Sequence, residues 1–236
     1  ASVYELATLL PAAAGELVLR EVDSLRKVTD GPLGAQLLKK LDSKGMTGLA
    51  YWDNGFKQMS ANKKLVAPSD YKGLKFRIQS SKVLEAQFRA LGSIPQVMAF
   101  SDVYQALQTG VVDGQENPLA TILSSKFYEV QDYAVMSNHI YSVWALLMGK
   151  KFWDKLSPDE QALITAAAKA ATAFERETIR AYAAKALEEL ESEGMTVTTL
   201  PEAEMAKLRE MTQPVREQFT EKFGPTEAQE MMTALQ

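Results

Sequence analysis

The stretch that decides the fold covers residues 71–119, YKGLKFRIQSSKVLEAQFRALGSIPQVMAFSDVYQALQTGVVDGQENPL. It begins with apolar residues that alternate with Lys75 and Arg77, which is typical of a half-buried strand. Short apolar segments then alternate with helical segments that end at Gly92 and Gly110. The expected strands cover 74–78, 95–99 and 111–113, and the expected helices cover 81–91 and 101–109. This alternation predicts an α/β fold with a largely parallel sheet.

The residues before this stretch add two helical pieces and one strand. Residues 16–41 have helical periodicity that is interrupted at Gly31-Pro32. Residues 45–52, GMTGLAYW, are apolar and end in aromatic residues, and the turn signal Asp53-Asn54-Gly55 follows. We therefore expect a short strand that ends at Trp52 and leads into a loop.

The residues after this stretch contain one very long helix. Ser157-Pro158-Asp159-Glu160 is a capping box with proline at the first helical position, and it opens a helical pattern that continues to about Glu193. At 1.5 Å per residue such a helix is roughly 55 Å long, so it should run past more than one lobe. Further strands are expected over 130–136, 139–148 and 195–200, and amphipathic helices over 201–223 and 226–235.

The composition excludes several classes of function. The 26 Lys and Arg residues and 30 Asp and Glu residues give a net charge of -4 without basic blocks, which argues against a nucleic-acid partner. No apolar run approaches the roughly 20 residues that span a bilayer. The absence of cysteine excludes thiol nucleophiles, cysteine-based zinc sites and disulfides. The single histidine, His139, argues against a histidine-rich metal site and against a Ser-His-Asp triad.

Two polar residues are candidates for ligand binding, and each has a structural interpretation beside the functional one. Arg77 is either a solvated strand charge or a clamp that holds a carboxylate through two parallel hydrogen bonds. Asn117 precedes Pro118 and is expected to cap a helix, but it also follows a parallel strand, at the edge where α/β folds bind ligands. Gln115 shares that edge.

His139 is expected to be a satisfied histidine of an apolar strand, with no partner carboxylate suggested nearby. Trp52 and Phe100 lie at strand ends, where aromatic residues either pack in a core or line a pocket wall.

Three segments together carry a family resemblance: YWDNGFKQMSAN over residues 51–62, YKGLKFRIQSS over 71–81 and MAFSDVYQALQTGVVDGQENPL over 98–119. They closely resemble the substrate-binding subunits of TRAP transporters, the DctP family. The resemblance continues through FYEVQDYAVMSNHIY at 127–141 and the long helix, and it covers about Val22 to the C-terminus. It implies a periplasmic, two-lobed α/β protein that closes on a small organic acid and delivers it to a sodium-driven permease, without enzymatic activity, metal or cofactor.

The resemblance also implies roles for individual residues. Arg77 matches the strand arginine that grips the ligand carboxylate, Asn117 matches the pocket asparagine of the ENP motif, and Phe100 matches the aromatic residue after a Met-Ala pair. Lys57 stands where many members have a second arginine, so it would make a contact with one donor instead of a fork. Trp52 matches a frequent aromatic residue beside the hinge.

We expect a periplasmic-binding-protein-like fold with a long lobe-spanning helix. Lobe one would comprise residues 1–54 and 143–182, and lobe two 55–142 and 183–236. Nothing before Tyr4 matches the strands and helices with which family members begin, so lobe one is expected to be incomplete. Either the chain is truncated, or its N-terminal stretch is rebuilt, or another chain completes the first sheet. An incomplete sheet has an exposed edge, which predicts self-association.

The expected function is therefore an extracytoplasmic receptor that captures a C4-dicarboxylate or a 2-oxo or hydroxy acid with an arginine clamp. A second possibility is a truncated or repurposed protein that acts as a ligand sensor or interaction module. A third is an enzyme acting on organic acids, with Asp113, Glu116 and His139 as acid or base groups.

Overall fold

The computed structural model describes residues 22–223. Expectations for residues 1–21 and for a helix over 226–235 lie outside the described residues. The α-helices and 3-10 helices (η) are α3 Val22–Thr29, α4 Pro32–Lys40, η1 Leu41–Lys44, η2 Pro68–Tyr71, α5 Lys82–Ala90, η3 Phe100–Asp102, α6 Val103–Gln108, α7 Leu119–Ser124, η4 Phe127–Glu129, α8 Lys150–Trp153, α9 Pro158–Ser192 and α10 Glu202–Phe223. The strands are β1 Met46–Ala61, β2 Lys75–Ile78, β3 Ile94–Val97, β4 Gly114–Pro118, β5 Tyr133–Gly149 and β6 Thr196–Thr199.

The six strands form one mixed sheet in the order β3-β2-β4-β1-β5-β6. β2 is parallel to β3 and β4, and β5 is parallel to β6, as an α/β chain predicts. The central strand β1 is antiparallel to both β4 and β5. The prediction of a largely parallel sheet is therefore right for the 71–119 stretch and wrong at the centre, because β1 and β5 come from outside that stretch.

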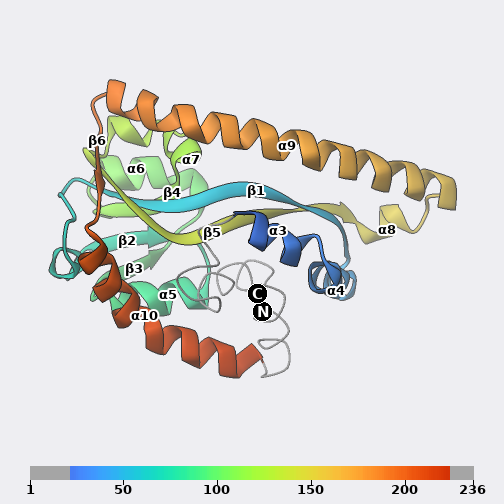
Figure 1. Cartoon of the computed structure of the whole chain (residues 1–236), viewed down its shortest axis with the longest axis horizontal. Coiled ribbons are helices and arrows are strands. Elements are labelled where there is room, and N and C mark those ends of the chain that lie inside the picture. The colour runs from blue at the N-terminus through green and yellow to red at the C-terminus, as the bar shows by residue number, and fades with distance from the viewer. Residues whose placement is uncertain (1–21, 224–236) are drawn as a thin grey trace.

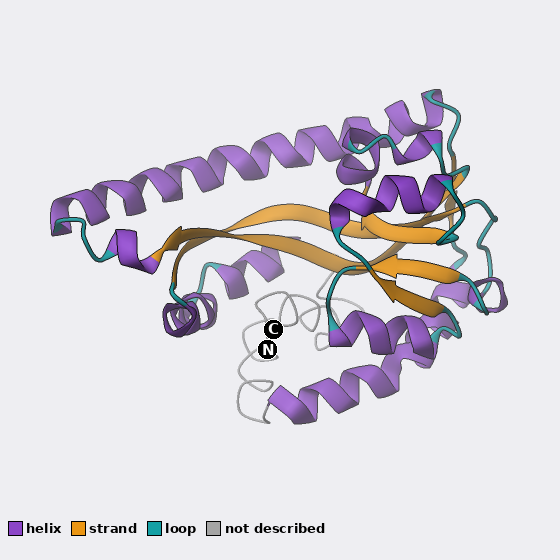
Figure 2. Ribbon diagram, turned by 180° about the vertical axis from the view of Figure 1, so that it is seen from behind, coloured by secondary structure: helices purple, strands orange, loops and turns teal. Residues whose placement is uncertain are grey.

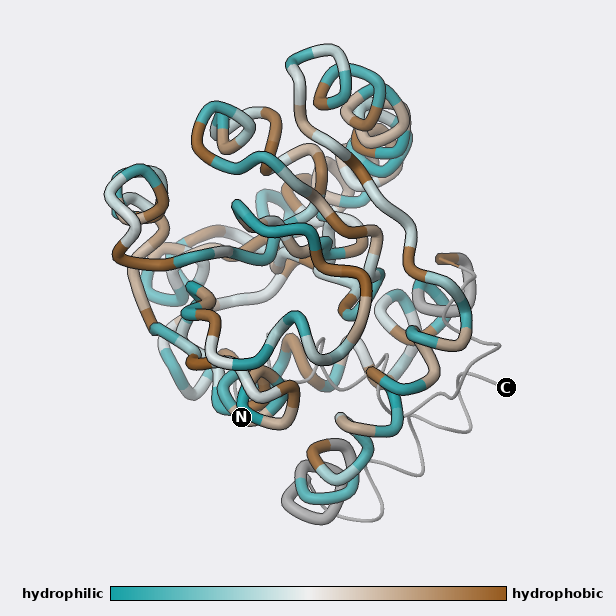
Figure 3. The backbone as a smooth tube through the Cα atoms, turned by 90° about the vertical axis from the view of Figure 1, so that its left-hand side faces the viewer, coloured by the Kyte–Doolittle hydropathy of each residue, from teal (hydrophilic) through white to brown (hydrophobic). Residues whose placement is uncertain are grey.

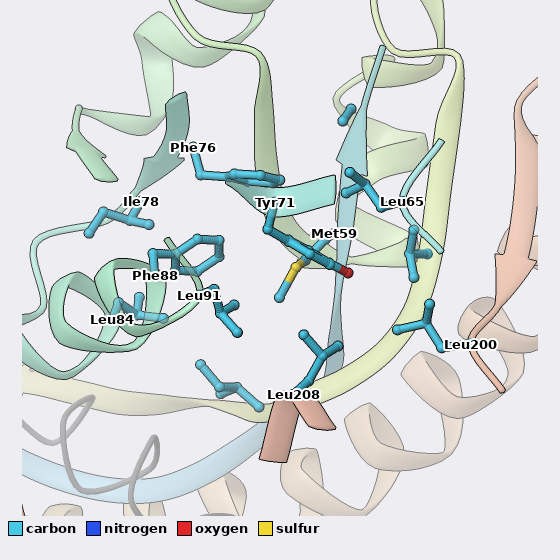
Figure 4. Close-up of a cluster of buried hydrophobic side chains, with 13 residues drawn as sticks. Met59, Leu65, Tyr71, Phe76, Ile78, Leu84, Phe88, Leu91, Leu200 and Leu208 are labelled. Atoms are coloured by element: carbon cyan, nitrogen blue, oxygen red, sulfur yellow. The ribbon is translucent and has the colours of Figure 1, made fainter. Parts of the chain in front are cut away.

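Helices cover both faces of the sheet (Figures 1 and 2). On one face, α5 and α10 enclose a core of Met59, Phe76 and Phe88, with Leu208 of α10 packed against it (Figure 4). On the other face, α6, α7 and α9 enclose a second core, which comprises Val103, Ala106, Leu107, Val112, Leu119, Ile122, Phe127, Ala134, Ala186, Leu190 and Met195. The helices around the sheet carry both hydrophobic and hydrophilic positions (Figure 3), as expected for helices with one buried face.

β1 and β5 are much longer than their neighbours and continue past them. β4 pairs with residues 57–61 of β1, and β6 pairs with residues 133–136 of β5. Beyond that point, residues 46–55 and 142–149 pair only with each other among the described residues. This two-stranded part, which we call the ribbon, runs beside α9, with α3 and α4 nearby (Figure 1).

The expected end of the first strand at Trp52 is wrong. Asp53-Asn54-Gly55 is a bulge, where the register with β5 shifts and Gly55 takes a φ of 100°, and β1 continues to Ala61. The strands expected over 130–136 and 139–148 are likewise one strand, β5, with a local irregularity at Asn138, whose φ is 43°. The hydrogen bonds between β1 and β5 stabilise the extended conformation more than the local turn sequences destabilise it.

The long helix is confirmed. Ser157 Oγ accepts a hydrogen bond from the Glu160 backbone N–H at 3.3 Å, and Glu160 Oε2 accepts one from the Ser157 N–H at 2.7 Å. This reciprocal capping starts α9 at Pro158, as the sequence predicts. None of the described helices is long and apolar enough to cross a membrane.

Candidate functional site

Arg77 lies in β2 with only 3% of its surface exposed. Phe76 and Ile78 point into the α5 core, as predicted, so Arg77 points to the opposite face. Its Nε and Nη2 both donate to the Met98 carbonyl oxygen, at 3.1 and 2.8 Å. The interpretation of Arg77 as a solvated strand charge is therefore wrong, because the guanidinium is buried and its plane is fixed by one carbonyl.

Phe100 lies next to this guanidinium, on η3 just after Met98. The Arg77 Cζ atom is 5.7 Å from the centre of the Phe100 ring, within the range of a cation–π contact. The Phe100 ring also lies against the Phe127 ring, at 6.0 Å between centroids. Phe100 is 48% exposed. It therefore presents an aromatic surface to solvent directly beside a buried cation.

A chain of buried amide and hydroxyl groups crosses the sheet on the Arg77 side. Asn117 Nδ2 donates to Gln115 Oε1 at 2.6 Å, and Gln115 Nε2 donates to Ser60 Oγ at 2.8 Å. Ser60 Oγ in turn donates to Gln131 Oε1 at 3.1 Å. Gln115 faces Arg77 across β2 and β4, so the chain ends close to the arginine. Ser60 and Gln131 carry no motif that would have identified them from the sequence.

The expected helix-capping role of Asn117 is wrong. The segment GQENP, expected to be a loop, is the strand β4, and α7 begins at Leu119 with Pro118 at its N-cap. The strand forms here because its backbone pairs with β1 and β2, and its buried polar side chains have hydrogen-bond partners on β1 and within β4. Asn117 therefore contributes its amide to the polar chain.

Lys57 lies on the other face of β4, where it forms a buried ion pair with Glu116. The Nζ to Oε1 distance is 2.7 Å, and the two side chains are 1% and 0% exposed. Lys57 Nζ also donates to Gln79 Oε1 at 3.3 Å. Burial lowers the pKa of Lys57, more than the neighbouring Glu116 raises it, and Arg77 lowers it further. Arg77 and Lys57 are therefore electrostatically coupled although they point to different faces.

His139 has a partner carboxylate, contrary to expectation. Its Nε2 is 3.4 Å from Glu116 Oε2, and its Nδ1 is 2.7 Å from Ser137 Oγ. Burial alone would raise the pKa of Glu116, but Lys57 and His139 together bring it below its ordinary value. The sequence could not place β4 and β5 on either side of β1, so this contact was missed.

Trp52 lies in the ribbon, away from these groups along β1. Its Nε1 donates to Thr172 Oγ1 of α9 at 3.1 Å. This hydrogen bond links the ribbon to the long helix. No contact described here joins Trp52 to Arg77 or its neighbours.

A second charged group joins the ribbon to α3 and α9. Asp53 forms an ion pair with Arg26, and its backbone N–H donates to Glu175 Oε2 at 3.1 Å. Arg176 donates to both carboxylate oxygens of Asp30, at 2.6 and 2.7 Å. The sequence assigned Asp53 to a turn and so missed this group. Residues 22–223 contain no group of three or more His, Cys, Asp or Glu side chains that could hold a metal ion.

Three comparisons identify proteins that this chain resembles. Residues 16–222 match the model of DctP, bacterial extracellular solute-binding protein, family 7. The C4-dicarboxylate-binding periplasmic protein DctP of Rhodobacter capsulatus is 47% identical over 208 residues, which is 88% of this chain and 62% of that protein. The chain thus spans less than two thirds of that relative's length.

Solved structures agree with this likeness. The sugar acid binding protein DctPAm of Advenella mimigardefordensis, in complex with galactonate, superposes with a TM-score of 0.91 at 36% identity, over 98% of this chain and 74% of that one. A TRAP periplasmic solute binding protein of Sulfurospirillum deleyianum with bound succinate gives a TM-score of 0.86 at 39% identity, over 92% and 72%. The α/β fold expected from the sequence is confirmed.

Proposed function

The chain belongs to family 7 of the bacterial extracellular solute-binding proteins, the DctP family, and we propose that it is the extracytoplasmic receptor of a TRAP transporter for a small organic acid. The observation that carries this proposal is the Arg77 guanidinium, buried and held in one plane by the Met98 carbonyl beside the exposed Phe100 ring.

The arrangement suits a carboxylate because an arginine offers two parallel donors that match its two oxygens. The Met98 carbonyl oxygen holds the guanidinium plane of Arg77, which would grip the ligand carboxylate. Asn117 and Gln115 would supply neutral polar groups next to it, and Phe100 an apolar wall. Lys57 would add a second cation.

The relatives support an organic acid as the ligand class. The Rhodobacter capsulatus relative is named for C4-dicarboxylates, and the two solved structures hold galactonate and succinate. All three ligands carry at least one carboxylate. For this chain we propose a C4-dicarboxylate or a 2-oxo or hydroxy acid, captured in the periplasm and delivered to the TRAP permease subunits without chemical change.

The proposal includes two lobes that close on the ligand, with lobe one over residues 1–54 and 143–182 and lobe two over 55–142 and 183–236. The ribbon of β1 and β5 supports this division, since it leads from one region to the other beside Trp52. Its outer edges carry no strand among the described residues, which favours the expected self-association of this chain.

The acid–base groups of the enzyme alternative have other contacts. Asp113 Oδ2 accepts a hydrogen bond from the Lys75 backbone N–H at 2.7 Å, and Glu116 and His139 are part of the buried charged group around Lys57. A ligand sensor or interaction module would use the same clamp but would not bind a permease. An assay of partner binding is therefore needed to distinguish it from a transport receptor.

A thermal-shift screen against mono- and dicarboxylates tests the proposal. A ligand that binds only the folded state raises the melting temperature with its concentration. We expect one class of organic acid to produce a clear shift that Arg77→Ala abolishes. A folded chain that shows no shift with any acid, or an unchanged shift in Arg77→Ala, would contradict the proposed function or the proposed clamp, respectively.

A further inference from the structure

The far end of the ribbon, where β1 begins and β5 ends, gathers lysines from two segments that are distant in the chain. Figures 1 and 2 show α4 and α8 at this end, on the opposite side of the molecule from α5 and the start of α10. The Lys150 backbone N–H donates to the Gly45 carbonyl oxygen at 2.9 Å, so residues 39–45 and 149–155 meet there. We call these two segments together the tip. Its lysines are Lys39, Lys40, Lys44, Lys150, Lys151 and Lys155.

The tip is positively charged in a chain that is negative as a whole. Its six lysines stand against two acids, Asp42 and Asp154, so its net charge is +4. The whole chain has a net charge of -4, so the other residues together carry -8. The sequence shows no basic block because these lysines are divided between two short segments.

The two segments of the tip act as one electrostatic unit. Asp42 Oδ2 lies 2.5 Å from Lys39 Nζ, within the first segment. Asp154 Oδ1 lies 2.5 Å from Lys150 Nζ, within the second. The hydrogen bond from Lys39 lowers the pKa of Asp42, and the positive charge of Lys150 lowers it further across the two segments.

The next acidic residues along the chain, Asp159 and Glu160, lie in the first turn of α9. Both carboxylates are at the positive end of the helix dipole, which offsets their charge in part. Even when both are counted with the tip, this end of the molecule keeps a net charge of +2.

An exposed aromatic ring lies among these lysines. Phe152 of α8 is 58% exposed, and Lys151 and Lys155 are exposed as well. The Lys155 backbone N–H donates to the Phe152 carbonyl oxygen at 3.0 Å, which continues the helical turn and brings the two residues side by side. A large apolar side chain is costly to leave in water, whereas a ring flanked by lysines suits the boundary between lipid headgroups and acyl chains.

The choice of basic residue favours a lipid surface over an acidic protein. The tip has six lysines and no arginine. Protein interfaces are enriched in arginine and depleted of lysine, and a single phosphate or carboxylate is best matched by the arginine fork. Lysines are flexible point charges, which suit a surface whose phosphates have no fixed positions. Their stems can also lie along an apolar layer while the ammonium groups stay in water.

We propose that the tip is a membrane-docking surface, on which the lysines contact anionic phospholipid headgroups and Phe152 enters the interface between headgroups and acyl chains. One aromatic ring and a few lysines give weak, reversible binding. Such binding would hold the proposed receptor beside the membrane that contains its permease. Arg77 lies in β2, outside the ribbon, so docking does not require a bound ligand and the inference does not depend on the proposed ligand class.

Co-sedimentation of the full chain with vesicles tests the proposal. Vesicles of equal parts phosphatidylglycerol and phosphatidylethanolamine are anionic, and vesicles of phosphatidylcholine have no net charge. Wild type should bind the anionic vesicles at low salt and dissociate as salt is added, because exposed charges are screened. It should not bind phosphatidylcholine. A lack of binding to anionic vesicles at low salt would overturn the proposal, and binding to immobilised polyglutamate in that case would indicate an acidic protein partner.

Two double variants separate the tip from the charge of the whole chain. Lys151→Gln/Lys155→Gln should weaken binding to anionic vesicles by about 25-fold, at roughly fivefold for each lysine. Lys82→Gln/Lys207→Gln removes the same charge from α5 and α10, where the two side chains are 74% and 58% exposed. This control should bind within about twofold of wild type, because these lysines lie far from the tip. Equal losses in the two double variants would contradict docking through the tip.

Phe152→Ser tests the apolar part of the surface. It should weaken binding to anionic vesicles by about tenfold and leave the steepness of the salt dependence unchanged, because no charge is altered. Phe152→Leu, which keeps an apolar side chain, should retain most of the binding. Urea unfolding of each variant confirms that it is folded. If Phe152→Ser bound as tightly as wild type, the ring would not enter the interface and the proposal would be wrong.

Discussion

Arg77→Lys tests separately the charge and the geometry of the proposed carboxylate clamp. The substitution keeps a cation in β2 but replaces a planar fork with a single ammonium. In the structure, Nε and Nη2 of Arg77 both donate to the Met98 carbonyl oxygen, and the guanidinium lies against the Phe100 ring. A lysine can keep at most one of the two hydrogen bonds, and it can no longer grip a carboxylate with two parallel donors.

The expected size of the effect follows from one lost hydrogen bond at each contact. A hydrogen bond to a charged group contributes about 1.5–3 kcal/mol. Losing one at Met98 should lower the free energy of unfolding by roughly that amount. Losing one at the ligand carboxylate should weaken binding by about 10- to 150-fold.

Isothermal titration calorimetry with the acid found in the thermal-shift screen measures the affinity, and urea unfolding measures stability. The matched control is Arg89→Lys on α5, where the arginine side chain is 63% exposed and pairs with Glu85. The control should leave affinity unchanged and alter stability by less than about 1 kcal/mol. If Arg77→Lys binds within about threefold of wild type, the fork geometry is not what holds the ligand.

Three further perturbations test other parts of the structure. Trp52→Phe removes the hydrogen bond to Thr172 and should lower the free energy of unfolding, measured in urea, by about 1 kcal/mol. Adding Thr172→Val to this variant should lower it little further, because the hydrogen bond is already lost. If the two losses were additive, the two residues would act independently. Ser157→Ala removes the α9 cap and should cost about 1 kcal/mol in the same assay, and no loss would show that the capping box is unimportant. Burial raises the pKa of Tyr51 to about 12, so the folded state should lose stability as the pH rises from the ordinary tyrosine pKa toward about 12. Tyr51→Phe should make the fall of the unfolding free energy with pH less steep. An equally steep fall in wild type and variant would contradict the burial effect. Self-association should appear as concentration-dependent sedimentation, and a strictly monomeric profile at high concentration would exclude it.

Features with a strong local signal could be predicted from the sequence. The capping box at Ser157 located the start of α9, because reciprocal side-chain bonds to the backbone form wherever that spacing occurs. The alternation around Phe76 and Ile78 gave the β2 strand and the direction of Arg77. The burial of Arg77 did not follow, because it depends on the Met98 carbonyl of another segment.

Features decided by distant partners could not be predicted. Asp53-Asn54-Gly55 has the composition of a turn, but pairing with β5 keeps it inside β1 as a bulge. Asn117 has the sequence context of a helix cap, but pairing with β1 and β2 makes it a strand residue. In both cases the local preference amounts to about 1 kcal/mol, which several strand hydrogen bonds outweigh.

The connection between β1 and β5 has a consequence for how the chain folds. These partners face each other from Met46–Gly149 to Ala61–Tyr133, so everything from residue 62 to residue 132 lies between the two halves of the central pair. Closing so long a loop costs conformational entropy before the contacts between β1 and β5 can form. Chains that are rich in such non-local contacts fold slowly. The intervening block contains Arg77, Phe100, Gln115 and Asn117, together with the local strand–helix units that can form early. We therefore expect these four residues to reach their places first, and the pairing of β1 with β5 to be completed as a late and slow step.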